Sequence, residues 1–183
     1  MSSATLEARD YSAIVTNPDD GVEIAITVMQ PALAAGATAP LILHGHGFGG
    51  ARLTNRHERS VYEVLSGGIL PSTEAARRAA NDGYFVISFD QRGFGDSGGC
   101  VEIMNPEVEG VDISAILDWA ENDMPERERL AYRNGDPIIG GLGLSYGGGF
   151  QLIGACIDDR FDALVPTATW YDLSYSLAPD NVV

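Results

Sequence analysis

A run of glycines around one serine is the feature that most restricts how this chain can fold. Residues 141–150 read GLGLSYGGGF and directly follow an apolar run. A strand that turns straight into a helix forces the corner residue into an uncommon backbone conformation, and the residues two positions to either side must be small because the chains cross there. Gly143 and Gly147 occupy those two positions. The segment predicts a buried strand, a corner at Ser145 and a helix over 147–157.

A serine at such a corner has a chemical use. Its hydroxyl is displayed above the sheet, and the amide of Tyr146 lies at the helix start, where unpaired N–H groups and the helix dipole stabilise a developing oxyanion. The alternative is a turn that binds phosphate. A phosphate loop has Lys before Ser or Thr and this chain has no Lys, while the pattern G-x-G-x-x-G drawn from Gly141 fails at Tyr146. We therefore interpret Ser145 as a candidate nucleophile.

A second glycine-rich loop precedes the serine by about a hundred residues. The short apolar run 41–43 predicts a strand buried on both faces, and it ends in HGHGFGG over residues 44–50. Loops after an earlier strand supply the second N–H donor of an oxyanion hole. Gly47 allows the backbone to approach a substrate, and we expect the donor to be the amide of Phe48, or that of His46 if the earlier His-Gly pair is the operative one.

The two histidines of this loop also admit a metal-site interpretation. His44 and His46 would need a third ligand, and the chain offers only His57, with no Cys or carboxylate adjacent. Loop geometry explains both histidines more simply. We expect no metal and no organic cofactor.

The pattern of elements predicts an α/β fold. An opening antiparallel hairpin and further strands are expected at 11–16, 22–29, 41–43, 84–90, 137–142 and 163–168. Helices are expected at 72–82, 105–122 and 147–157, and the charged segment 123–136 is expected to be exposed. Alternation of strands and helices implies a mostly parallel sheet with helices on both faces.

Charge and composition exclude some partners. With 26 acidic and 11 basic side chains, the net charge of −15 repels nucleic acid and anionic membranes. The spacing of Cys100 and Cys156 suggests neither a disulfide framework nor a metal site, and a reducing compartment fits best. Because no signal peptide or membrane span is seen, a cytoplasmic location is expected. The oligomeric state is not predicted.

Three motifs together resemble those of a known superfamily. They are the His-Gly-Phe-Gly-Gly loop at 46–50, the D-x-R-G-x-G-x-S-x-G loop at 90–99, and Gly-Leu-Ser-Tyr-Gly-Gly at 143–148. From about residue 41 onward the chain resembles the N-terminal part of an α/β-hydrolase. More narrowly, it is similar to the Xaa-Pro dipeptidyl-peptidase and cocaine-esterase-like acyl hydrolases.

The resemblance implies roles for particular residues. Ser145 would be the nucleophile, and the amides of Tyr146 and Phe48 would bind the oxyanion. Arg92 and Asp96 would tie loops together near the site. Residues 170–172 resemble a segment at the rim of the active site, but the family places its acid after a later strand, so Asp172 is not expected to be the triad acid.

The triad base is missing from the sequence. All three histidines precede Ser145, and His57 matches nothing in the family and reads as a solvated loop residue. We therefore expect residues 1–183 to be the N-terminal portion of one hydrolase domain, without the cap, the acid and the base. The predicted function is a serine hydrolase of small esters or of peptide and amide bonds. The alternatives are a hydrolase-like binding or scaffold protein without turnover, and an esterase of the dienelactone or polyester type.

Overall fold

The computed structural model describes residues 4–57 and 71–181. A six-stranded mixed sheet has the strand order β1-β2-β4-β3-β7-β8. Its strands are β1 Arg9–Thr16, β2 Glu23–Gln30, β3 Leu41–Gly45, β4 Phe85–Phe89, β7 Ile139–Leu144 and β8 Phe161–Thr167. The pairs β1–β2 and β2–β4 are antiparallel, and the pairs β4–β3, β3–β7 and β7–β8 are parallel. The predicted hairpin and mostly parallel sheet are confirmed.

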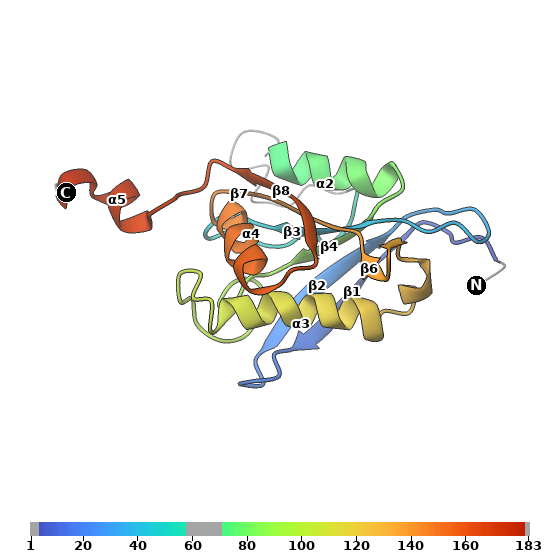
Figure 1. Ribbon diagram of the computed structural model, residues 1–183, viewed down its shortest axis with the longest axis horizontal. Coiled ribbons are helices and arrows are strands. Elements are labelled where there is room, and N and C mark those ends of the chain that lie inside the picture. Colours follow the sequence, from blue (N-terminus) through green and yellow to red (C-terminus); the bar gives the residue numbers. More distant parts are fainter. Residues whose placement is uncertain (1–3, 58–70, 182–183) are drawn as a thin grey trace.

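Helices cover both faces of the sheet. α2 (Pro71–Asn81) lies on one face, and α3 (Glu109–Asn122) and α4 (Tyr146–Ile157) lie on the other (Figure 1). α4 packs against β3, β7 and β8, while α3 packs against α4 and β1. The helix predicted over 105–122 begins later, at Glu109, because the backbone of Asn105 forms a turn that accepts the amides of Val108 and Gly110.

The central strands are buried on both faces. Along β4, Phe85 and Ile87 pack into the larger core beneath α3 and α4, whereas Val86 between them packs into a smaller core with Ala76 and Ala80 of α2. Alternate side chains of a strand point to opposite faces. A strand covered on both sides therefore needs an unbroken apolar run, and its polar residues are confined to its ends.

The expectation that segment 123–136 is exposed is wrong in part. It contains a 3₁₀ turn at Arg127–Arg129 and the strands β5 Tyr132–Arg133 and β6 Asp136–Pro137. Met124 and Leu130 are buried, and so is the Arg129 guanidinium, which donates to the carbonyls of Ala34 and Ala37 at 2.6 Å each. This segment can be partly buried because the Arg129 side chain donates hydrogen bonds to backbone carbonyls of a loop that is distant in the sequence.

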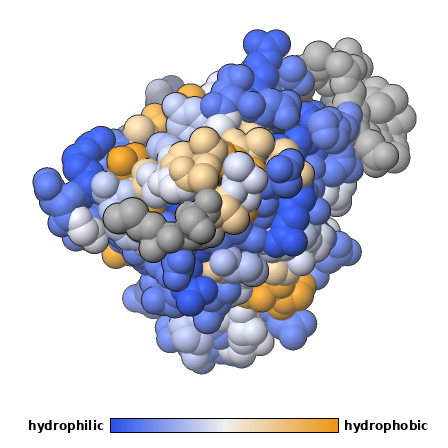
Figure 2. Space-filling view, turned by 90° about the vertical axis from the view of Figure 1, so that its right-hand side faces the viewer, coloured by the Kyte–Doolittle hydropathy of each residue, from blue (hydrophilic) through white to orange (hydrophobic). Residues whose placement is uncertain are grey.

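The last elements leave the body of the molecule. After β8, the helix α5 (Leu173–Leu177) and a 3₁₀ turn at Pro179–Asn181 extend away from the sheet (Figure 1). The face seen in Figure 2 is mainly hydrophilic with separate small apolar areas, as expected for a chain with a net charge of −15. Within the described ranges, none of the helices has the length and apolar character needed to span a bilayer.

Candidate active site

The corner between β7 and α4 has the strained conformation that the sequence predicts. Ser145 has φ 57° and ψ −116°, a region that non-glycine residues rarely adopt. Its amide donates to the carbonyl of Thr167 on β8 at 2.8 Å, and its own carbonyl accepts the amide of Gly148 at 2.8 Å. Strand pairing on one side and the first helical turn on the other hold the residue in place.

The two flanking glycines are required by close backbone contact. A Cβ at Gly143 would overlap the carbonyl of Gly147 and lie 2.8 Å from the carbonyl oxygen of Gly45. A Cβ at Gly147 would overlap the Gly45 carbonyl and lie 2.9 Å from the carbonyl oxygen of His46. Three stretches of main chain therefore meet at this corner. The third, at the end of β3, was missed because Gly45 is a hundred residues away in the sequence.

The predicted oxyanion loop lies beside the serine. A Cβ at Gly47 would be 4.0 Å from the Cβ of Ser145, with no serious overlap, and Gly47 does not have a positive φ. Neither backbone crowding nor a positive φ therefore requires glycine at this position. The Phe48 side chain is 60% exposed, and its ring packs edge-to-face on Tyr146 and Phe94, with centroids 5.5 and 5.1 Å apart.

Two backbone N–H groups at this place have no hydrogen-bond partner among the described residues. Across residues 4–57 and 71–181, the amides of Phe48 and Tyr146 donate no hydrogen bond. The first amides of a helix have no intrahelical acceptor, which accounts for Tyr146. Such unpaired donors are suited to hold a developing negative charge.

His46 is a structural residue of the loop. Its Nδ1 donates to the carbonyl of Gly47 at 2.7 Å, and its Nε2 accepts the amide of Gln91 at 3.1 Å, which fixes the tautomer. Burial lowers the pKa of this imidazole, so the ring stays neutral. His44 bonds Ser88 of β4 through Nδ1 at 3.0 Å, and His57 is exposed. In the described part of the chain no three His, Cys, Asp or Glu side chains cluster as a metal site.

The loop after β4 is built around a buried carboxylate. Asp90 accepts the amides of Arg52 and Asp96, at 2.6 and 3.0 Å, and pairs with the Arg52 guanidinium. Gly95, at φ 54°, lies so close that a Cβ would overlap this carboxylate. Arg52 was missed by the sequence analysis because a single Arg in a loop carries no pattern. Asp96 also accepts from Arg52, so its predicted tying role is confirmed.

Arg92 ties three segments together, as predicted. Its guanidinium donates to both carboxylate oxygens of Asp112 on α3, at 2.8 and 2.7 Å, and to Asp20 in the hairpin turn at 2.7 Å. The Arg92 and Asp112 side chains are almost wholly buried. The arginine joins the turn between β1 and β2 to α3, and it does not line the cavity at Ser145.

A mainly apolar cavity of about 550 Å³ opens at Ser145. Its lining has three aromatic or large aliphatic groups near the serine and a second set from the segment after β8. The lining residues are Phe48, Ile103, Ser145, Tyr146, Ala168, Thr169, Trp170, Leu173, Ser176 and Leu177. The predicted rim position of Trp170 agrees with this lining. Tyr171 is fully exposed, and Asp172 caps α5 by accepting the amide of Tyr175 at 2.8 Å.

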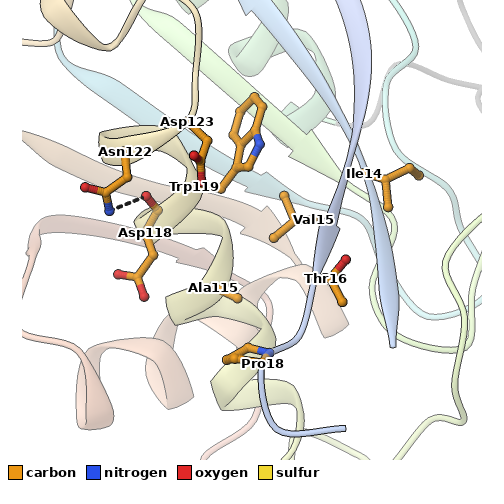
Figure 3. Close-up of a pocket in the computed structure, with 9 residues that line it drawn as sticks. All are labelled: Ile14, Val15, Thr16, Pro18, Ala115, Asp118, Trp119, Asn122 and Asp123. Atoms are coloured by element: carbon orange, nitrogen blue, oxygen red, sulfur yellow. Dashed lines mark hydrogen bonds between the residues drawn. The ribbon is translucent and has the colours of Figure 1, made fainter. Parts of the chain in front are cut away.

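A second hollow of about 480 Å³ lies between β1 and α3, away from the serine (Figure 3). Trp119 and Val15 face each other across it, and Ile14 lies on the other side of β1. The Asp118 carboxylate is paired with Arg160 at 2.8 Å, and the Asn122 amide is bonded to the Asp118 carbonyl. Its lining has the Asp118 and Asp123 carboxylates but no strained nucleophile like Ser145, so the Ser145 cavity is the candidate site.

A serine corner at the carboxyl edge of a mostly parallel sheet, beside a glycine-rich loop from the neighbouring strand, defines the α/β-hydrolase class. Within that class the chain belongs to the X-Pro dipeptidyl-peptidase (S15) family, whose sequence model matches residues 20–183. The family resemblance of the three motifs is thereby confirmed.

Curated and solved proteins are also similar to this chain. An uncharacterized 31.7 kDa Escherichia coli protein from the traX-finO intergenic region is 32% identical over 134 residues, which are 73% of this chain and 38% of that protein. The fold is similar to a CocE/NonD family hydrolase from Staphylococcus aureus (TM-score 0.62, 18% identity, 94% of this chain and 33% of the other). It is also similar to the α/β-hydrolase GrgF from Penicillium sp. sh18 (TM-score 0.61, 16% identity, 91% and 48%). The chain thus spans less than half the length of each of these proteins.

Proposed function

We propose that the protein containing this chain is a serine hydrolase that cleaves carboxylic esters or amides through an acyl-serine intermediate. The proposal is carried by one observation: the strained Ser145 lines a cavity beside two unpartnered amides, those of Phe48 and Tyr146. The family assignment supports the same reaction class.

The chemistry follows from this arrangement. The Ser145 oxygen attacks the carbonyl carbon of the substrate and loses its proton to a base, while the two amides hold the negative charge on the carbonyl oxygen. Collapse of the tetrahedral intermediate breaks the ester or amide bond, and the leaving group takes up the proton. Water then attacks the acyl-serine ester, releases the carboxylic acid and restores the serine.

The base is proposed to lie outside residues 1–183. His46 cannot accept the serine proton, because one ring nitrogen donates to Gly47 and the other accepts from Gln91. A histidine and its orienting carboxylate would come from further polypeptide, with residues 1–183 as the N-terminal portion of one hydrolase domain. The greater length of the compared proteins supports this division.

The cavity favours an uncharged, apolar acyl group. Among the residues that the structure describes, the lining has no charged side chain, and aromatic and aliphatic groups provide most of the wall. A dipeptide with a free amino terminus would need a carboxylate partner there, because a buried unpaired ammonium is costly. We therefore favour esters of small apolar acids over N-terminal dipeptides as substrates.

A fluorophosphonate probe tests the nucleophile. The chain, supplied with imidazole as an external base, is incubated with the probe, and the adduct is located by mass spectrometry. We expect labelling of Ser145 that is abolished by Ser145→Ala and kept by Ser176→Ala, since Ser176 lines the same cavity. Labelling that survives Ser145→Ala would disprove the assignment. Reversible binding of an apolar ester analogue without any adduct would favour the non-catalytic alternative.

A further inference from the structure

A strained strap forms one wall of the Ser145 cavity. We define the strap as residues 102–105, which lie just before α3. Ile103 and Met104 both have positive φ angles, 57° and 63°. Left-handed backbone is strained for non-glycine residues, and for a β-branched residue such as Ile103 it is a true outlier. Ile103 lines the cavity while Met104 is buried, so something must hold the strap in this shape.

One buried carboxylate holds both ends of the strap. Glu109 is only 5% exposed. Its Oε1 accepts the amide of Glu102 at 2.9 Å, and its Oε2 accepts the amide of Asn105 at 2.7 Å. Hydrogen bonds to an ionised acceptor are about twice as strong as neutral ones. They can offset the backbone strain of the two residues between them.

The same carboxylate reaches the residue that follows the serine. The Tyr146 hydroxyl donates to Glu109 Oε1 at 3.0 Å, and burial together with the nearby carboxylate raises the pKa of this phenol. The Tyr146 ring forms part of the cavity wall, 6.0 Å from the Trp170 ring centre and 5.5 Å from that of Phe48. Glu109 therefore joins the strap to the first residue of α4.

We propose that Glu109 is a positioning residue that fixes the width of the acyl cavity. By holding Ile103 in the cavity wall, it makes the cavity select small apolar groups over bulky ones. The selection rests on the proposed function in one respect, namely that this cavity receives the acyl group. Glu109 itself touches neither the substrate nor the reacting atoms.

The role of Glu109 can be measured by comparing how tightly a small and a bulky amide bind, without any catalytic turnover. In a Trp119→Phe background Trp170 is the one remaining tryptophan of the chain, and its fluorescence reports binding of butanamide and of 3-phenylpropanamide. We expect Glu109→Ala to reduce the preference for the small amide about tenfold, because the loss of a charged hydrogen-bond acceptor frees the strap. Glu109→Gln keeps one acceptor oxygen but sets an NH2 group against one of the two amides, so it should reduce the preference by an intermediate factor. The exposed Glu107→Ala is the matched control.

Amide exchange provides the second readout. In Glu109→Ala the amides of Glu102 and Asn105 should exchange at least about tenfold faster, with core amides of β4 unchanged, because only the local partner is lost. If Glu109→Ala does not fold, Tyr146→Phe takes its place, and it should reduce the selectivity by a smaller factor. Unchanged selectivity in the variant that folds overturns the proposal. Neither the ligand selectivity nor the amide exchange involves the Ser145 hydroxyl. If the fluorophosphonate probe fails to label Ser145, that result contradicts the proposed hydrolase function and leaves the role of Glu109 to these two measurements.

Discussion

At the scale of single residues, β7 contains a glycine that must be glycine and one that need not be. A Cβ at Gly143 would overlap backbone, whereas a Cβ at Gly140 would meet a carbonyl oxygen at 3.6 Å, an ordinary contact. We predict that Gly143→Ala lowers the free energy of unfolding by about 3 kcal/mol or more, because backbone cannot move aside as a side chain can. Gly140→Ala should change it by less than about 1 kcal/mol. Urea denaturation of both variants measures the difference, and equal losses would contradict the geometry.

A second residue-scale prediction concerns pH. Burial lowers the pKa of His46 below its ordinary value of 6.5, so the folded state disfavours the imidazolium. The contribution of the neutral ring is fully present above about pH 6.5 and is lost as the pH falls through the lower folded-state pKa. We expect the free energy of unfolding to decrease over this range, and His46→Gln to decrease less steeply.

The acidic groups act in a separate pH range. The hydrogen bond from Arg92 holds the pKa of Asp20 below its usual 3.8, so stability from this group is lost only at lower pH. Denaturation curves of the wild type and of His46→Gln between pH 8 and pH 4 therefore isolate the histidine. Parallel curves for the two proteins would show that His46 is not the titrating group.

The residues that the sequence predicts are those whose partners are near in the chain. Gly143 and Gly147 flank Ser145, so their spacing alone predicts the corner. Glu109 lies 37 residues from its partner Tyr146, and Arg52 lies 38 residues from Asp90. Only the folded sheet brings these pairs together, and a single Glu or Arg in a sequence is most often solvated.

At the scale of elements, Arg92 fastens the β1–β2 turn and the loop after β4 to α3. We predict that Arg92→Lys lowers the free energy of unfolding by about 2 kcal/mol or more, since an ammonium cannot reproduce the paired donors to Asp112 and Asp20 in a buried place. Arg133→Lys is the control, because Arg133 is 67% exposed and makes one 3.4 Å contact with Asp162. It should cost less than about 0.5 kcal/mol. Similar costs for both substitutions would contradict the role of Arg92.

Element boundaries are predictable where one local pattern decides them. The range 84–90 is almost wholly apolar, and β4 occupies Phe85–Phe89 within it. The segment 123–136 is charged in sequence, yet part of it is buried, because Arg129 turns inward to three backbone carbonyls. Composition indicates how charged a segment is but not which of its charges meet an acceptor.

At the scale of the whole molecule, the two edges of the sheet differ. β8 is an edge strand whose Val165 is 54% exposed, and it borders an apolar groove of about 320 Å³. β1 is the other edge strand, with α3 packed against it. We predict that the isolated chain self-associates through β8, because an exposed edge with apolar side chains templates strand pairing.

Salt should strengthen this association. The net charge of −15 repels other copies, and raising NaCl from about 0.1 M to about 1 M shortens the Debye length from roughly 10 Å to roughly 3 Å. Sedimentation velocity should show larger species at high salt, reduced by Val165→Arg and much less by Ile14→Arg on β1, where Ile14 is 50% exposed. An equal effect of the two variants would exclude β8 as the contact.

The corner at Ser145 is set by main chain against main chain, at Gly45, Gly143 and Gly147. Peptide units have the same dimensions in every protein, so the height of the hydroxyl is independent of how the interior is filled. We therefore expect that hydrophobic residues can be exchanged in the two cores while the Ser145 hydroxyl oxygen keeps its position. The position of the Ser145 hydroxyl is therefore anchored to peptide geometry, which does not vary with the side chains around it.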